Sequence, residues 1–103
     1  MAHSQNCREL RITNDAAVVA KFKADGPNGR IATSGNMIMG ETWKFNMRDH
    51  GCSRQLITIS ADVKGGKNPA TFQVNYNGFE TMTYFVRLSG TIFKTTFDSI
   101  EVL

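Results

Sequence analysis

Apolar and polar residues alternate in short runs along almost the whole chain, from Arg8 to Val102. Gly, Asn, Asp and Ser interrupt these runs at close intervals. A period of two is typical of half-buried β-strands, and the interrupting residues are those that form tight turns. No segment of the sequence combines a helical period with capping residues. The pattern therefore predicts an all-β protein, an antiparallel β-sandwich of about seven to nine short strands, with a small barrel as the alternative.

The same alternation predicts which side chains face the core and where the chain turns. The expected inward residues are Leu10 and Ile12; Val18, Ala20 and Phe22; Trp43, Phe45 and Met47; Ile57, Ile59, Ala61 and Val63; Phe72, Val74 and Tyr76; Met82, Tyr84, Val86 and Leu88; and Phe93, Thr95 and Phe97. Turns are expected at Asn14-Asp15, residues 25–29, 34–36 and 64–69, Asn77-Gly78 and Ser89-Gly90. Asn-Gly is a strong hairpin signal, and short connections favour antiparallel neighbours over parallel crossovers. A phase slip after Phe97 predicts a β-bulge near Asp98-Ser99.

Length and charge narrow the class of protein further. The chain has 103 residues, so we expect one domain, residues 1–103. Twelve Lys and Arg against nine Asp and Glu give a net charge of +3, and the basic residues are spread along the sequence. We interpret them as solvated surface and expect no nucleic-acid partner. No apolar stretch approaches the ~20 residues that cross a bilayer, and the N-terminus lacks the apolar core of a signal peptide. Localisation is left open between the cytoplasm and a mature secreted form.

The two cysteines, Cys7 and Cys52, allow two interpretations. A disulfide would tie the N-terminal strand to a mid-chain loop, close about 45 residues and stabilise the fold by about 3–4 kcal/mol. Alternatively, both are thiols, as is usual in reducing compartments. Two cysteines are too few for a structural zinc site unless His3 and His50 complete it, so we expect no metal and no cofactor. A calcium site assembled from distant loops stays open.

Groups for catalysis are sparse. His3 and His50 are the only histidines, and the carboxylates are scattered along the chain. A nucleophile pair of Cys52 and His50 would need an orienting group and an oxyanion site, which neighbours on one loop rarely supply. Residues 64–67 are basic and Gly-rich, but they lack the strand–loop–helix context of a phosphate cradle. The sequence therefore predicts that the protein is not an enzyme.

A first candidate ligand site is the polar loop that offers Arg48, Asp49, His50 and Arg54. β-Sandwiches bind sugars and headgroups with loops at one end or with a polar sheet face, using aromatic rings together with Asn, Asp and Arg. The alternative interpretation of this segment is a solvated loop. A Thr-rich sheet face is a further polar surface, although hydroxyls there also reflect β-propensity.

A second candidate ligand site is the turn that contains Asn75, Tyr76, Asn77 and Phe79. It places two amides and two aromatic rings close together. Phe79 follows Asn-Gly directly and is difficult to bury at a hairpin tip. Tyr76 has a competing interpretation as a core residue, because it continues the inward face of Phe72 and Val74.

A motif in the first half of the chain has the sequence Ile-Met-Gly-Glu-Thr-Trp-Lys-Phe-Asn at residues 38–46, followed by Gly51-Cys52 and Arg54. Together with the compatible segments Ile12-Thr13-Asn14 and Gly29-Arg30, this motif resembles a pattern of the aegerolysin family. The resemblance covers residues 8–54, and the composition is also similar to that of small lectin-like β-sandwich proteins. The chain is shorter than that family's members and lacks their Trp-rich second half, so no functional residue is transferred. The resemblance implies a β-sandwich that binds membrane lipids.

These observations predict a non-enzymatic recognition module that binds a glycan or a lipid headgroup, in the manner of a lectin, through loops at one end. Homo-oligomers are compatible with this role, because multivalency raises a weak affinity. One alternative is a membrane-acting cytolysin or toxin component, with a membrane surface as its partner. Another is a structural or protein-partner module that pairs through an exposed edge strand.

Overall fold

The computed structural model describes residues 5–52, 55–66, 69–78 and 81–103. These residues form nine β-strands and no helix. The strands are β1 (Gln5–Asn6), β2 (Glu9–Asn14), β3 (Ala20–Gly26), β4 (Gly29–Met37), β5 (Thr42–Asn46), β6 (Gln55–Val63), β7 (Ala70–Tyr76), β8 (Thr83–Thr91) and β9 (Lys94–Val102). The candidate residues Arg54 and Phe79 lie outside the described residues.

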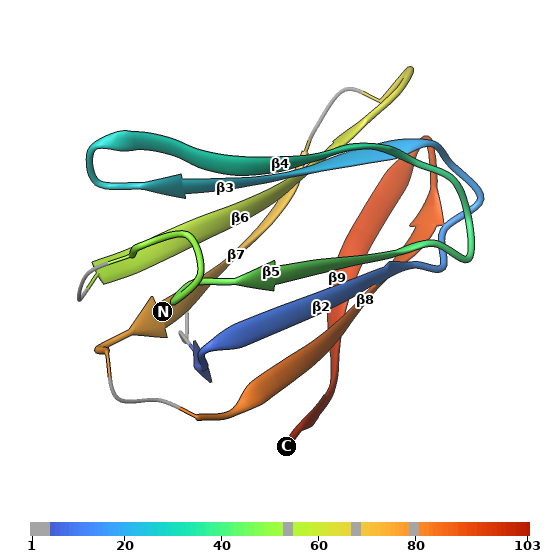
Figure 1. Ribbon diagram of the computed structural model, residues 1–103. Helices are drawn as coiled ribbons and strands as arrows, with labels where there is room; N and C mark the ends of the chain where they lie inside the picture. Colours follow the sequence, from blue (N-terminus) through green and yellow to red (C-terminus); the bar gives the residue numbers. More distant parts are fainter. Residues whose placement is uncertain (1–4, 53–54, 67–68, 79–80) are drawn as a thin grey trace.

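The strands form two sheets that pack face to face (Figure 1). One sheet has the order β1-β7-β6-β3-β4, and the other has the order β5-β2-β8-β9. Two separate sheets around one core make the protein a β-sandwich, as the alternation predicted, and not a closed barrel. Most neighbours are antiparallel, but β2 pairs with β8 in parallel and β1 pairs with β7 in parallel.

The parallel pairs correct the expectation of a purely antiparallel sandwich. They arise at the N-terminus, where β1 joins one sheet and β2, two residues later, joins the other. A first strand has no preceding hairpin to dictate its neighbour, so it pairs wherever an edge or a gap is open. Strand β2 fills the space between β5 and β8.

The inward faces are largely those that the alternation predicts. Phe22 of β3 is fully buried at the centre, where its ring lies 6.3 Å from that of Trp43 and 6.2 Å from that of Phe97. Every inward residue predicted for β6 is buried: Ile57, Ile59, Ala61 and Val63. Burial of these apolar faces between the sheets is the main driving force for the fold. It also leaves the outward positions of both sheets to polar side chains.

Two predicted turns have other roles: the chain continues as a strand through residues 34–36, and at Asn77-Gly78 it crosses from one sheet to the other. Residues 34–36 belong to β4, where a bulge places Ser34 and Gly35 opposite Phe22 of β3. Gly35 has φ +74°, and the Ser34 hydroxyl accepts the Phe22 amide at 2.9 Å. Asn77-Gly78 does not close a hairpin either, since β7 and β8 belong to different sheets. A glycine signal therefore marked a bulge in one case and a crossing between sheets in the other.

The last hairpin turns later than predicted. Strand β8 runs through Ser89-Gly90, and the turn consists of Ile92 and Phe93, between the paired residues Thr91 and Lys94. Phe93, expected in the core, is 91% exposed as a consequence. The bulge predicted near Asp98-Ser99 is confirmed, because the register with β8 shifts between Ser99 and Glu101.

The connections gather at two ends of the sandwich (Figure 1). We call the right-hand end of Figure 1 the Val19 end; it comprises residues 15–19, 38–41, 64–66 and 92–93. The left-hand end is the His50 end, with residues 27–28, 47–52 and 77–78. The two ends differ in chemistry, as described below.

A buried asparagine organises the Val19 end. Asn14 is fully buried, and its side-chain amide donates to the carbonyls of Val18 at 2.9 Å and Met37 at 3.0 Å. Its side-chain oxygen accepts the Ala16 amide at 3.1 Å. One side chain thus joins the end of β2, the connection to β3 and the end of β4.

Candidate functional site

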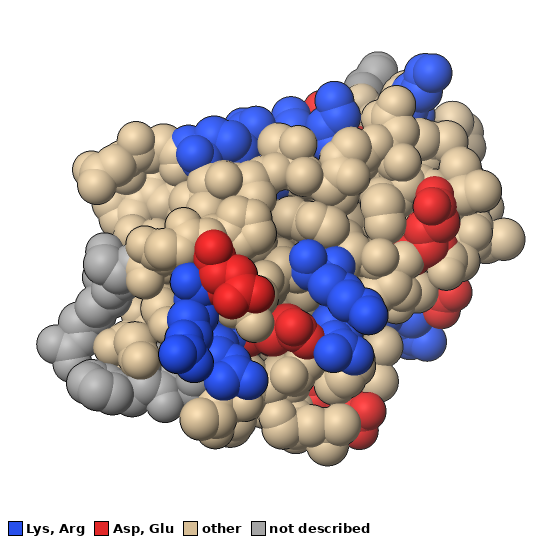
Figure 2. Space-filling view, in the orientation of Figure 1, with Lys and Arg blue, Asp and Glu red and all other residues tan. Residues whose placement is uncertain are grey.

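The outer face of the β6-β3-β4 layer is polar as a direct result of strand alternation. Ala20, Phe22 and Ala24 of β3 are buried, so Lys21 and Lys23 point to solvent. The register places Lys21 opposite Asn36 on β4 and opposite Asp62 on β6. It also places Lys23 opposite Ser60 of β6. Basic side chains form a row over β3 and β4 along the upper rim of Figure 2.

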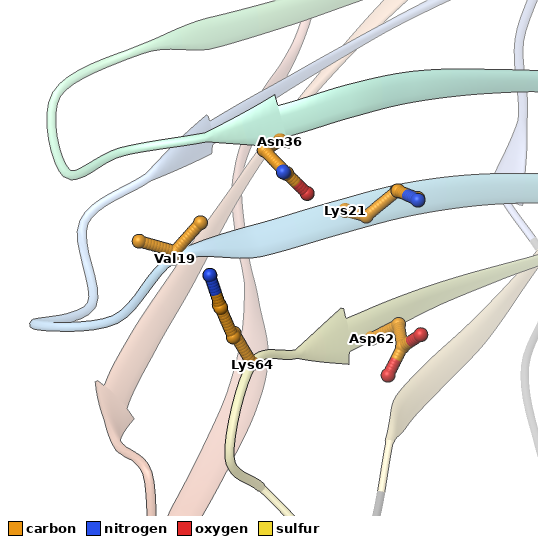
Figure 3. A pocket seen from close by; sticks show the side chains of 5 residues that line it. All are labelled: Val19, Lys21, Asn36, Asp62 and Lys64. Carbon is orange, nitrogen blue, oxygen red and sulfur yellow. The ribbon is translucent and has the colours of Figure 1, made fainter.

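A pocket of about 250 Å³ lies on this face, close to the Val19 end (Figure 3). Its lining residues are Val19 from the β2–β3 connection, Lys21 from β3, Asn36 from β4, Asp62 from β6, and Lys64, which directly follows β6. The Lys64 amide donates to the Val19 carbonyl at 2.9 Å, which holds the two segments together. In Figure 3, Lys64 rises beside Val19, and the amide of Asn36 points toward the strand that carries Lys21.

The charges of this pocket are unbalanced. Asp62 is engaged by Lys23, whose Nζ lies 3.2 Å from Oδ2. Among the described residues, neither Lys21 nor Lys64 forms an ion pair. Two lysines and an asparagine therefore line a hollow whose one carboxylate is already paired. Ammonium groups are compact charges with three donors each, and this set suits a small anionic group with hydroxyls nearby.

Sequence reasoning missed this pocket because its residues are far apart in the chain. Lys21 and Lys64 are among the basic residues interpreted as solvated surface, and residues 34–36 are predicted as a turn. The only signal in the sequence is that Lys21 and Asp62 occupy outward positions on their strands. Which outward residues of β3, β4 and β6 lie side by side depends on the register, and that is visible only in the structure.

The first predicted loop, between β5 and β6, lies at the His50 end. Arg48, Asp49 and His50 are exposed, in agreement with either interpretation of this loop. The His50 ring lies 4.9 Å from that of Phe45, and its Nδ1 is 2.9 Å from the Asn46 carbonyl oxygen. These contacts fix the imidazole against its own loop, where it can offer only its outer edge to a ligand.

The second predicted turn lies at the same end, but its aromatic part is not on the surface. Tyr76 is 4% exposed, so its ring belongs to the core, as the competing interpretation held. Asn75 is partly buried and donates from its side chain to Asn6 at 3.2 Å. Asn77, partly buried, follows directly at the end of β7.

The N-terminal segment brings the two predicted sites together. The Cys7 amide donates to the Asn75 carbonyl at 3.2 Å, and the Arg8 carbonyl accepts the Met47 amide at 2.9 Å. The two loops therefore flank the junction of β1 and β2. With Tyr76 buried, the described residues of this end present charges and amides, and His50 is the exposed ring among them.

The cysteines lie on neighbouring segments of the His50 end. In the structure no disulfide joins Cys7, which is buried, to Cys52, which is partly buried. The Cys52 amide donates to the Met47 carbonyl at 3.0 Å, and the Met47 amide donates to the Arg8 carbonyl. Burial raises the pKa of the Cys52 thiol, and a hydrogen bond with the Gln55 side chain opposes this effect. Disulfide formation between the two residues stays a prediction.

The described residues show two further features that bear on function. They bring no three His, Cys, Asp or Glu side chains together in an arrangement that could hold a metal ion. They also contain no helix with the length and apolar character that crossing a membrane requires.

Comparison with known proteins gives no family for this chain. No protein-family model matches the sequence, and no curated protein sequence matches it. The likeness to the aegerolysin family is therefore a resemblance carried by residues 8–54, and the functional argument rests on the structure.

Proposed function

We propose that the protein is a non-enzymatic recognition module that binds the anionic headgroup of a glycan or a lipid. The observation that carries the proposal is the pocket lined by Lys21 and Lys64, neither of which has an ion-pair partner among the described residues. A phosphate, sulfate or carboxylate would accept hydrogen bonds from both ammonium groups, and the Asn36 amide would bond to a neighbouring hydroxyl. Asp62 would accept from a second hydroxyl while keeping its contact with Lys23.

The openness of the site sets the expected strength of binding. Each ammonium group lies at the surface, where an ion pair contributes at most about 1 kcal/mol and is screened by salt. Binding of one headgroup is therefore weak and becomes weaker as ionic strength rises. Several headgroups displayed on one surface would raise the apparent affinity, as multivalent display generally does.

A glycan array combined with liposome sedimentation tests the proposal. The variant Lys21→Gln/Lys64→Gln removes both ammonium groups and keeps similar side-chain volume, so we expect binding about tenfold weaker. The matched variant Lys44→Gln/Arg48→Gln removes the same charge from β5 and from the loop that follows it, and should bind normally. If the second variant loses binding and the first does not, the site lies at the His50 end. If the wild-type protein bound neither glycans on the array nor liposomes, the proposal would be wrong.

A further inference from the structure

The hairpin between β8 and β9 presents apolar side chains to solvent. Its two-residue turn consists of Ile92, which is 46% exposed, and Phe93, which is 91% exposed. Turn positions usually hold Gly, Asn or Asp, because these residues tolerate a left-handed backbone or form hydrogen bonds with it. An apolar side chain at a turn stays in contact with water after folding, so its burial contributes nothing to the fold. Adjacent exposed apolar side chains, unlike single scattered ones, are a feature of surfaces that bind a protein or a membrane.

The backbone holds Phe93 outward. Gly90 has φ +116°, and a Cβ at this position would overlap the carbonyl oxygen of Lys94. The Gly90 carbonyl accepts the Ala17 amide at 3.2 Å, and the Phe93 amide donates to the Thr91 hydroxyl at 3.3 Å. The hairpin is thereby fixed on both sides, so the ring is fully exposed in a defined position.

A second apolar tip lies at the β4–β5 connection. Ile38 is 60% exposed and Met39 is 61% exposed. This turn is also closed by hydrogen bonds, since the Ile38 amide donates to the Glu41 carboxylate at 2.8 Å and the Gly40 amide donates to the Asn14 carbonyl at 2.6 Å. Of the eight large apolar side chains that the described residues expose, four belong to these two tips.

The two tips lie at the same end of the sandwich. Strand β2 pairs with β5 on one side and with β8 on the other. The last residue of β2, Asn14, is opposite Leu88 of β8, and its amide donates to the Glu41 carbonyl at 2.9 Å. The strands that lead to the tips are thus two inter-strand spacings apart, about 10 Å. Both tips flank the β2–β3 connection, which contains the pocket residue Val19.

We propose that the Val19 end docks on a lipid bilayer that contains anionic headgroups, with Phe93, Ile92, Ile38 and Met39 inserted at the level of the acyl chains. Charge supports a bilayer as the occupant. Lys94 follows Phe93 directly and is exposed, and Lys64 lies at the same end. Lysines around an apolar tip keep their ammonium groups among the headgroups while the apolar atoms enter the interface.

The two acidic groups of this end, Glu41 and Asp15, each have a partner within the protein. The Glu41 carboxylate accepts the Ile38 amide within its own turn. Asp15 lies 4.0 Å from the guanidinium of Arg87. The apolar residues also form two separate tips rather than one flat patch. A fluid interface closes around separate tips, whereas a protein partner needs a continuous complementary surface.

The docking goes beyond the proposed headgroup binding, because the apolar tips carry it; Lys64 is the one residue that both proposals use. The test uses vesicles of phosphatidylcholine with and without phosphatidylserine. We expect the wild-type protein to sediment with the phosphatidylserine vesicles and Phe93→Ser to partition about ten- to hundredfold more weakly. Leu56→Ser is the matched control, since Leu56 is 42% exposed at the start of β6, at the His50 end, and should leave partition unchanged.

A fluorescence measurement reads insertion directly. Phe93→Trp keeps an aromatic ring at the tip, and its emission should shift to the blue with phosphatidylserine vesicles and be quenched by brominated acyl chains. Trp43 is partly buried between the sheets, so the wild-type protein supplies the background signal. Unchanged emission of bound Phe93→Trp, or normal partition of Phe93→Ser, would overturn the inference.

The same variants separate this inference from the proposed function. Loss of binding by Lys21→Gln/Lys64→Gln together with normal partition of Phe93→Ser would leave headgroup recognition standing and overturn insertion. Loss by Phe93→Ser alone would support insertion and contradict the pocket. Self-association in the absence of lipid that Phe93→Ser abolishes, together with no binding to vesicles, would assign the tips to a second copy of the chain and overturn the inference.

Discussion

Replacing Asn14 with alanine should destabilise the protein more than almost any other single polar substitution. The side chain is fully buried and makes three hydrogen bonds, with the carbonyls of Val18 and Met37 and the amide of Ala16. Each bond contributes about 1 kcal/mol net, and a buried donor left without an acceptor costs about 1–3 kcal/mol. Asn14→Ala should therefore lower the free energy of unfolding by about 3–5 kcal/mol. A domain of this size has about 5–15 kcal/mol in total.

Urea unfolding followed by tryptophan fluorescence measures this loss, because Trp43 packs between Phe22 and Phe45. The control is Asn36→Ala, which removes an exposed asparagine of β4 and should change stability by less than about 0.5 kcal/mol. Hydrogen exchange adds a local readout, since amides of residues 15–19 should lose protection first. A loss below about 1 kcal/mol for Asn14→Ala would refute the reasoning that this side chain organises the Val19 end.

Two further predictions concern the glycine of the last hairpin and the thiols. Gly90→Ala should destabilise the fold by about 2 kcal/mol or more, because φ +116° disfavours a Cβ and the added atom meets the Lys94 carbonyl; an unchanged urea midpoint would contradict this. Cys52 should react with iodoacetamide more slowly than glutathione at neutral pH, since burial raises its pKa and less thiolate is present; its rate should increase as the pH rises past the ordinary value of 9.0, and a rate equal to that of glutathione at neutral pH would be inconsistent with the burial. Intact mass with and without reductant shows whether Cys52 pairs with Cys7.

The fold class could be predicted from the sequence because burial on one face imposes a period of two. Ile57, Ile59 and Val63 alternate with polar residues, and each is buried where the pattern placed it. The turns were harder to predict, since glycine serves several purposes. Gly35 marks a bulge and Gly90 marks a close approach of two strands, and neither lies at a turn. Local sequence shows that a glycine is needed but not which of these roles it has.

The candidate site could be predicted only in part for a related reason. Arg48 and His50 belong to a loop that the sequence delimits, and both are exposed as a surface site requires. Lys21 and Lys64 are 43 positions apart in the chain. They line the same pocket only because β3 pairs with β6. The exposure of Phe93 could not be predicted either, because its place in the turn depends on where the pairing of β8 and β9 ends. The alternation of apolar and polar residues specifies which face of each strand is buried. A site depends on which outward residues the pairing register brings side by side.

Titration of ¹⁵N-labelled protein with glycerol phosphate tests headgroup recognition at the pocket most directly. A phosphate bound there should shift the amide resonances of Lys21, Asn36 and Lys64, and the shifts should disappear in Lys21→Gln/Lys64→Gln and weaken as salt is added. Shifts confined to residues 48–50 and 75–77, or no shifts at millimolar ligand, would contradict the account.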